Sequence, residues 1–191
     1  GTQTLDLSDC EANNGSVMRF AGNISKLKLP DGIVSVRLTS RDMTGNIDEL
    51  VLPEGMKKLK IGCSMIGGKV DEVVLPSTME SLDILEYVPF AGCRRITGNI
   101  GAIRLPDGMH TLILARCTQI RGAVTALVLP RGMKAVSLTG CRRITGDLSK
   151  LVLPEGMDSL NLFGTDREHQ LITGELSASE RTKVQRYDNP D

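Results

Sequence analysis

The stretch CRRITG occurs twice, at 93–98 and 141–146, and places a cysteine directly before two arginines. Guanidinium groups beside a thiol favour the thiolate, which is both a nucleophile and a metal ligand. The arginines offer a different chemistry, because their planar forks match carboxylate and phosphate groups. The pattern therefore raises two possibilities, a reactive cysteine or an anion-binding surface.

The cysteine chemistry lacks the residues that would complete it. The chain has only two histidines, His110 and His169, and neither lies near a cysteine in the sequence pattern. No C-x-x-C spacing suits zinc, and there is no Gly-rich phosphate loop or Ser-His-Asp arrangement. The sequence therefore predicts a protein that is not an enzyme and that has no cofactor and no metal site.

Six prolines reveal an internal repeat, since they are separated by 23, 23, 30, 24 and 24 residues. They are Pro30, Pro53, Pro76, Pro106, Pro130 and Pro154. The full unit reads I-x-x-L-x-L-P-x-G-M-x-x-L-x-L-x-x-C-x-x-I-T-G-x. Each L-x-L places both leucines on one face of a strand. We therefore expect two strands per coil, L-x-L-P and the second L-x-L, joined by Pro-x-Gly and Thr-Gly turns.

Stacked coils of this kind form a mainly β solenoid with parallel sheets, little helix and about seven coils over 1–176. One column of turn glycines, placed after or in the position of the Thr-Gly pair, should need either positive φ or a close approach of the backbone. These glycines are Gly22, Gly45, Gly68, Gly98, Gly122, Gly146 and Gly174. The polar segment 177–191 is a tail or a short cap, and either Ser179 caps a helix carrying Val184 and Tyr187 or the segment is disordered.

All five cysteines fall at one repeat position and form a predicted cysteine ladder. They are Cys10, Cys63, Cys93, Cys117 and Cys141. We interpret them as small buried residues whose weak S–H donors face the turn backbone. Equivalent side chains point the same way, which argues against disulfides between coils. Unpaired thiols favour a reducing compartment, so the expected location is cytoplasmic or nuclear, although the start of the chain leaves a removed signal peptide open.

The segments 112–122 (LILARCTQIRG) and 136–146 (VSLTGCRRITG) resemble the cysteine-containing subclass of leucine-rich repeats. The repeat of 23 to 24 residues, with a second L-x-L-P strand where that subclass has a helix, is closer to nested leucine-rich repeats with two strands per coil. The resemblance covers nearly all of 1–176. It implies a right-handed horseshoe or straighter solenoid and a role in protein interaction, but it does not supply the partner.

Three coils carry extra residues before the I-T-G turn, and solenoid insertions at one repeat position project from one rim. Aromatic residues lie in or beside these inserts, and arginines follow the cysteines. The candidate partner-binding residues are Phe20, Tyr87, Phe90, Arg94, Arg95, Arg116, Arg121, Arg142, Arg143 and Phe163. Two alternatives stay open at this point: the aromatics fold back onto their own loops, and the charges form a solvated edge.

Composition limits the partners. The 23 basic and 23 acidic residues cancel, which argues against nucleic acid, and no apolar run is long enough for a membrane helix. The Pro-x-Gly turns should form an acidic edge opposite the arginines. We therefore predict a protein-binding module that uses the arginine-lined rim, most simply for an acidic segment. The alternative is a structural module that assembles with itself through its ends or through a column of outward valines in the L-x-L-P segments.

Overall fold

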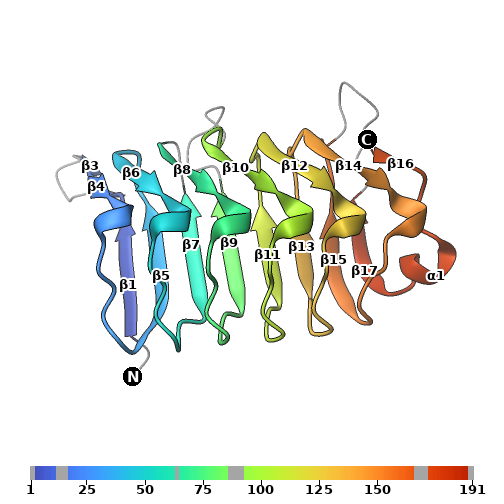
Figure 1. The fold of residues 1–191 in the computed structure, drawn as a ribbon, viewed down its shortest axis with the longest axis horizontal. Helices are drawn as coiled ribbons and strands as arrows, with labels where there is room; N and C mark the ends of the chain where they lie inside the picture. The colour runs from blue at the N-terminus through green and yellow to red at the C-terminus, as the bar shows by residue number, and fades with distance from the viewer. Residues whose placement is uncertain (1–2, 12–16, 63–64, 86–92, 166–171, 189–191) are drawn as a thin grey trace.

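The computed structural model describes residues 3–11, 17–62, 65–85, 93–165 and 172–188. Its two main sheets are parallel, one of eight strands and one of seven, and a two-stranded hairpin is added near the N-terminus (Figure 1). Within each main sheet, every strand pairs with the corresponding strand of the next coil. The predicted mainly β solenoid with parallel sheets is therefore confirmed.

Seven strands of the eight-stranded sheet are the second L-x-L units, and the eighth, β17 (Val184–Asp188), comes from the segment after Leu176. The strands of this sheet are β1 (Gln3–Ser8), β5 (Ile33–Thr39), β7 (Lys58–Gly62), β9 (Ser81–Leu85), β11 (Thr111–Leu114), β13 (Ala135–Ser137), β15 (Met157–Asn161) and β17. The hairpin pairs β2 (Cys10–Glu11) with β3 (Val17–Met18).

The seven-stranded sheet is built from the I-T-G units. The sequence pattern predicted turns there, but these residues form short strands. The strands of this sheet are β4 (Gly22–Asn23), β6 (Met43–Asn46), β8 (Ile66–Lys69), β10 (Ile96–Asn99), β12 (Gln119–Ala123), β14 (Arg143–Asp147) and β16 (Ile172–Thr173). A 3-10 turn follows each of the first six. These turns are η1 (Ile24–Lys26), η2 (Ile47–Glu49), η3 (Val70–Glu72), η4 (Ile100–Ala102), η5 (Val124–Ala126) and η6 (Leu148–Lys150).

The prediction that L-x-L-P forms a strand is wrong, and backbone amides explain why. The amide of Leu50 donates to the Ile47 carbonyl at 3.2 Å and closes η2, and Leu127 does the same to Val124 at 3.1 Å. Pro53 and its equivalents have no amide to donate. Two donors are therefore lost from these short segments in five of the six coils, and the extended backbone of the segments joins no sheet. Its first apolar residue is still largely buried in most coils, as at Leu50 and Leu127.

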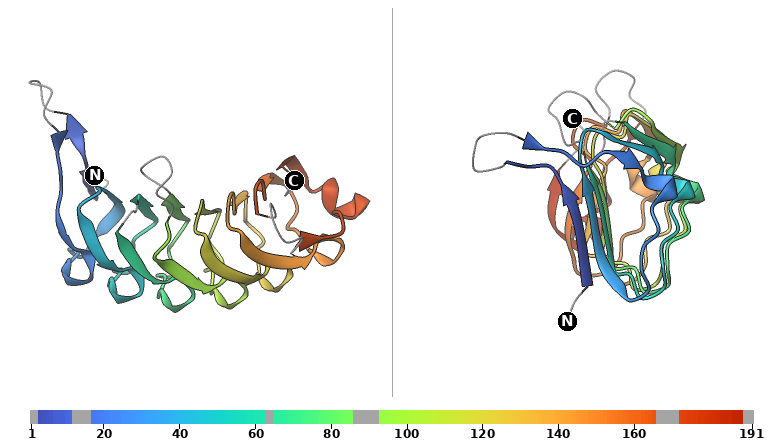
Figure 2. Two further views of the ribbon diagram at one scale, coloured as in Figure 1. Left: turned by 90° about the horizontal axis from the view of Figure 1, so that it is seen from above. Right: turned by 90° about the vertical axis from the view of Figure 1, so that its left-hand side faces the viewer.

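The coils stack along an arc (Figure 2). The eight-stranded sheet lines its concave side, and the 3-10 turns lie on its convex side. Side chains of both sheets and of the turns meet between the two layers; Leu112, Leu114, Ile120 and Val124 of a single coil are all at most 1% exposed. An aliphatic core of this kind is stabilised by the transfer of apolar surface out of water.

Neighbouring coils interlock where an Asn or Asp of one coil lies against a glycine of the next. The Asn99 side chain accepts from the Gly101 amide at 3.1 Å and caps η4. Its oxygen would lie 2.1 Å from a Cβ added to Gly122, whose φ is +110°. The predicted glycine column does have positive φ throughout, and here the glycine also leaves room for the capping oxygen.

We predict that Gly122→Ala destabilises the protein more than Gly55→Ala does. Both glycines have positive φ, which costs an alanine about 1–2 kcal/mol, but nothing lies within 4 Å of a Cβ at Gly55. The clash with Asn99 should add about 1–3 kcal/mol, measured by urea unfolding. In an Asn99→Ala background the two glycine substitutions should cost about the same; a difference that persisted there would contradict the interlock.

The segment after Leu176 completes the solenoid. Ser177, rather than the expected Ser179, caps the short helix α1 (Ala178–Arg181), with its hydroxyl 3.3 Å from the Glu180 amide. The chain then forms β17, which pairs with β15 and extends the concave sheet. Val184 therefore lies in a strand instead of the helix that the sequence suggested.

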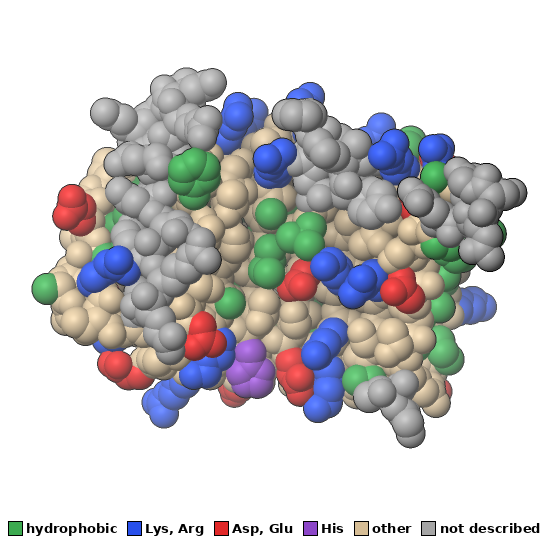
Figure 3. Space-filling model, turned by 180° about the vertical axis from the view of Figure 1, so that it is seen from behind, with side chains coloured by type: hydrophobic (Ala, Val, Ile, Leu, Met, Phe, Trp, Pro, Cys, Tyr) green, Lys and Arg blue, Asp and Glu red, His purple; other side chains and the backbone are tan. Residues whose placement is uncertain are grey.

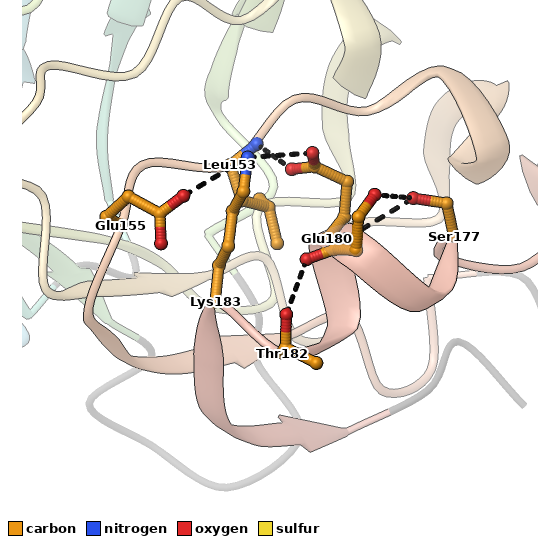
Figure 4. A network of polar contacts seen from close by, with 7 residues as sticks. Leu153, Glu155, Ser177, Glu180, Thr182 and Lys183 are labelled. Atoms are coloured by element: carbon orange, nitrogen blue, oxygen red, sulfur yellow. Dashed lines mark hydrogen bonds and ion pairs between the residues drawn. The ribbon is translucent and has the colours of Figure 1, made fainter.

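Glu180 joins this cap to the preceding coil (Figure 4). Its carboxylate accepts from the Leu153 amide at 2.6 Å and from Lys183 at 2.8 Å, and Lys183 also lies 3.7 Å from Glu155. The Lys183 hydrogen bond, supported by the Leu153 amide, lowers the pKa of Glu180. The cap is thus held by one carboxylate that satisfies a partly buried backbone donor.

We predict that Glu180→Ala loosens this end of the solenoid, at a cost of about 1.5–3 kcal/mol for a hydrogen bond to a charged group. Hydrogen exchange at the Leu153 amide should become faster. Because the folded pKa lies below the ordinary 4.5, this stabilisation is complete above pH 4.5 and is lost as the pH falls through the folded pKa. Glu180→Gln, which keeps an acceptor for Leu153, should lose the pH dependence and retain more protection. Equal protection in both variants and the unchanged protein would contradict this role.

Candidate functional site

The predicted arginines lie along the edge where the chain passes from the concave sheet to the seven-stranded sheet. Arg94 and Arg95 form the turn before β10, Arg142 precedes β14, and Arg143 begins it. Arg121 lies within β12. All five side chains are exposed, and the set is called the arginine edge below.

The strand register brings two of these arginines together. Neighbouring strands of the seven-stranded sheet are staggered by two residues relative to the repeat, so Arg121 pairs with Arg143 although its repeat equivalent is Thr145. On the other side Arg121 pairs with Asn99. The sequence indicated a general arginine column but not this direct pair, because the stagger is visible only in the strand pairing.

The arginine edge has no counter-charge within the described part of the chain. None of its five side chains forms an ion pair with a residue in those ranges. Like charges directly opposite on neighbouring strands destabilise a sheet, typically by a few tenths of a kcal/mol. The Arg121–Arg143 pair therefore leaves an uncompensated positive field that an anionic group could neutralise.

The concave face shows the opposite arrangement. In its N-terminal half Asp6, Arg37, Lys60 and Asp83 occupy one row on four successive strands. Asp6 and Arg37 lie 3.7 Å apart, and Lys60 lies beside Asp83 in the register. The row therefore supplies its own counter-charges. In Figure 3, which views the molecule from the side opposite to Figure 1, basic side chains gather along the upper edge.

Arg116 has the one positive φ, +56°, among the described residues other than glycine. The equivalent positions in the next two coils are Gly140 and Gly164, with φ of +72° and +69°. The left-handed backbone lets the Arg116 amide donate to the Thr139 carbonyl at 2.7 Å, while its own carbonyl accepts from the Cys93 amide at 3.2 Å. An exposed arginine thus occupies a position where the fold favours glycine.

The two predicted aromatic residues that the structure describes, Phe20 and Phe163, lie near opposite ends of the solenoid. Phe20 follows β3 in the first coil and is 38% exposed, next to Arg19, which pairs with Asp42. Phe163 follows β15 near the other end and is 45% exposed; its carbonyl accepts from the Gly140 amide. Tyr87 and Phe90, and most of the three inserts, lie outside the described residues.

The Pro-x-Gly edge, which the sequence predicted to be acidic apart from Arg131, also carries several lysines. Lys57 lies 2.8 Å from Glu80 on this edge. Lys134 donates to the Gly156 carbonyl at 2.9 Å, and Lys183 lies near Glu155. Stacking brings lysines of one coil beside acids of the next, so the two signs alternate there.

Three of the cysteines are buried side by side, as expected, with thiols facing backbone carbonyls. Cys93 donates to Leu85 at 3.2 Å and Cys141 to Leu114 at 2.7 Å. Contacts with the thiols of Cys141 and then Cys93, together with burial, raise the pKa of Cys117 well above its ordinary value. Cys117 therefore stays protonated at neutral pH and is a poor nucleophile.

The other two cysteines differ from this arrangement. Cys10 lies in the β2–β3 hairpin opposite Met18 and is exposed, so its place in the predicted ladder is wrong. The hairpin turns the chain away from the core, so Cys10 does not reach the buried place that the other described cysteines occupy. Cys63 lies outside the described residues.

Two further findings bear on the class of function. Among the residues described, His, Cys, Asp and Glu side chains form no group of three or more that could hold a metal ion. No helix within the described ranges is long and apolar enough to cross a membrane.

Comparison with known proteins adds no family. No protein-family model matches the chain, and no curated protein sequence matches it.

We predict that Arg116→Gly leaves the fold intact and stabilises it by up to about 1 kcal/mol, because glycine relieves the left-handed strain. Arg116→Ala removes the same guanidinium but keeps the strain, so it should be the less stable of the two variants. Thermal and urea unfolding of both variants measure the difference. If alanine and glycine were equally stable at this position, the strain would not exist.

Proposed function

We propose that this protein is a non-enzymatic interaction module of leucine-rich-repeat type, whose arginine edge binds an acidic segment of a partner protein. The observation that carries the proposal is the Arg121–Arg143 pair, which is in register on neighbouring strands and has no described counter-charge. Guanidinium groups bind carboxylates through two parallel hydrogen bonds, so a carboxylate between the two arginines would turn their repulsion into attraction.

The surroundings of this pair support a protein ligand. Arg142 directly precedes Arg143, and Arg94 and Arg95 lie two coils away on the same edge. Coils are spaced by about 4.8 Å, so the arginines extend over a length that an extended peptide could follow with several acidic side chains. Nucleic acid recognition would need aromatic platforms for the bases, and the described arginine edge has none.

We predict that Arg121→Glu/Arg143→Glu weakens binding of a fluorescein-labelled decaglutamate peptide at least tenfold in fluorescence anisotropy at low salt, because repulsion replaces two charge-assisted contacts. The control, Lys26→Glu/Lys28→Glu, makes the same change in net charge at two exposed lysines in another coil. Equal weakening of peptide binding in both variants would mean that the loss comes from the change in net charge and not from the arginine edge. Unchanged binding in the arginine variant would contradict the proposed site.

The same two variants test the interaction in the source cell. Proteins captured from lysate by the unchanged protein and by the lysine control, but lost from the arginine variant, should be enriched in acidic segments. A partner retained equally by all three proteins would place recognition away from this edge.

A further inference from the structure

A second surface lies on the convex side of the solenoid, away from the arginine edge. Val51, Val74, Val128 and Val152 are 78%, 81%, 78% and 74% exposed, the highest values among the exposed large hydrophobic residues. All four occupy the middle position of the L-x-L-P segment, directly after a 3-10 turn. Because coils stack in register, the four side chains form one column across the molecule, called the valine column below.

β-Propensity does not explain the valine column. Branched residues are favoured on the pleated surface of a sheet, but these segments belong to neither sheet. Proline removes one amide from each segment, and in every segment of the column except that of Val74 the 3-10 turn uses the first amide. An exposed apolar column with no role in the fold is typical of an interaction surface.

The order of residues in the column reads nearly the same in both directions. From the first coil to the sixth it is Lys28, Val51, Val74, Arg104, Val128 and Val152. Arg104 is therefore flanked by two valines on each side. A surface of this kind can pair with a second copy of itself across a two-fold axis near Arg104, so that Val74 meets Val128 and Val51 meets Val152. The same pairing brings the two Arg104 side chains together at the axis, a like-charge contact that the four valine contacts must offset.

The charges beside the column determine the direction of pairing. The exposed residues at the ends of the 3-10 turns are Lys26, Glu49, Glu72, Ala102, Ala126 and Lys150. Antiparallel columns place Glu49 of one copy beside Lys150 of the other. Parallel columns, the other two-fold arrangement, would place the flanking residues of the two copies on opposite sides of the column, so the Glu49–Lys150 contact would not form.

Glu49 and Lys150 are both available for such a contact. The Asn46 amide donates to Glu49 at 2.9 Å and lowers its pKa, so the carboxylate is charged at neutral pH. Glu49 forms no ion pair with any described residue. The Lys150 side chain is 77% exposed and lies 3.5 Å from Asp147, an exposed contact that is readily exchanged.

We propose that the valine column is the interface of an antiparallel homodimer with its two-fold axis near Arg104. This proposal is independent of the arginine edge, because no residue is shared between the two surfaces. The column is one residue wide and lies on a convex face, so the contact area is small and the dimer dissociates readily on dilution.

Analytical ultracentrifugation from about 5 µM to about 1 mM tests the proposal, a range suited to a small interface. The unchanged protein should increase in mass towards a dimer. Val74→Lys should weaken association at least tenfold, because it places an ammonium group against Val128. Val74→Lys/Val128→Glu should recover most of the association, since antiparallel pairing then puts each lysine beside a glutamate.

A second set of variants tests the contact between Glu49 and Lys150 and leaves the valines unchanged. Glu49→Lys and Lys150→Glu should each weaken the dimer about threefold to tenfold, as like charges then meet, and the combined exchange should restore it. A monomer throughout the concentration series would overturn the proposal, as would double variants no better than their single variants. Arg121→Glu/Arg143→Glu should leave the dimer unchanged, so failure of this proposal and failure of the arginine-edge proposal are distinguishable.

Discussion

At five of the six described coil junctions an Asn or Asp of one coil lies against the glycine of the next, and at three of them the same side chain caps a 3-10 turn. The side chain of Asn99 caps its own 3-10 turn and fills the place where Gly122 would carry a Cβ. Where it occurs, the contact joins local structure to stacking, because the residue that starts the turn also limits which residue of the next coil can lie against it. The junction between β12 and β14 lacks the contact, since Ala123 starts η5 and Gly146 lies against Val124, yet its strands keep the same two-residue stagger.

The repeat made most of the architecture predictable. The period of the prolines and the alternating leucines indicated stacked coils with parallel sheets, and the glycine column indicated positive φ. The sequence misled where two segments had the same pattern. Both L-x-L units alternate, but only one keeps its amides for a sheet, since Leu50 donates within η2 and Pro53 has no donor. A pattern of side chains carries no information on which backbone donors are already used.

The candidate site was predictable only in part, for a related reason. The arginines after the cysteines were evident as a column, but the neighbours of each arginine depend on the stagger between strands. The strain at Arg116 was similarly hidden until its φ could be compared with Gly140 and Gly164. Cys10 shared the spacing of the buried cysteines, yet a hairpin takes it to the surface. Positions near the inserts thus depart from the repeat, because the chain there follows a different path.

Stacking also constrains charge, because an exposed residue repeated at one position becomes a column of like groups only 4.8 Å apart. Most of this molecule avoids the resulting repulsion. The row from Asp6 to Asp83 contains both signs, and lysines on the Pro-x-Gly edge lie beside acids of neighbouring coils. The five side chains of the arginine edge lack such compensation among the described residues, and Arg121 and Arg143 face each other directly. This uncompensated pair is the basis of our proposal that a ligand supplies negative charge at this edge.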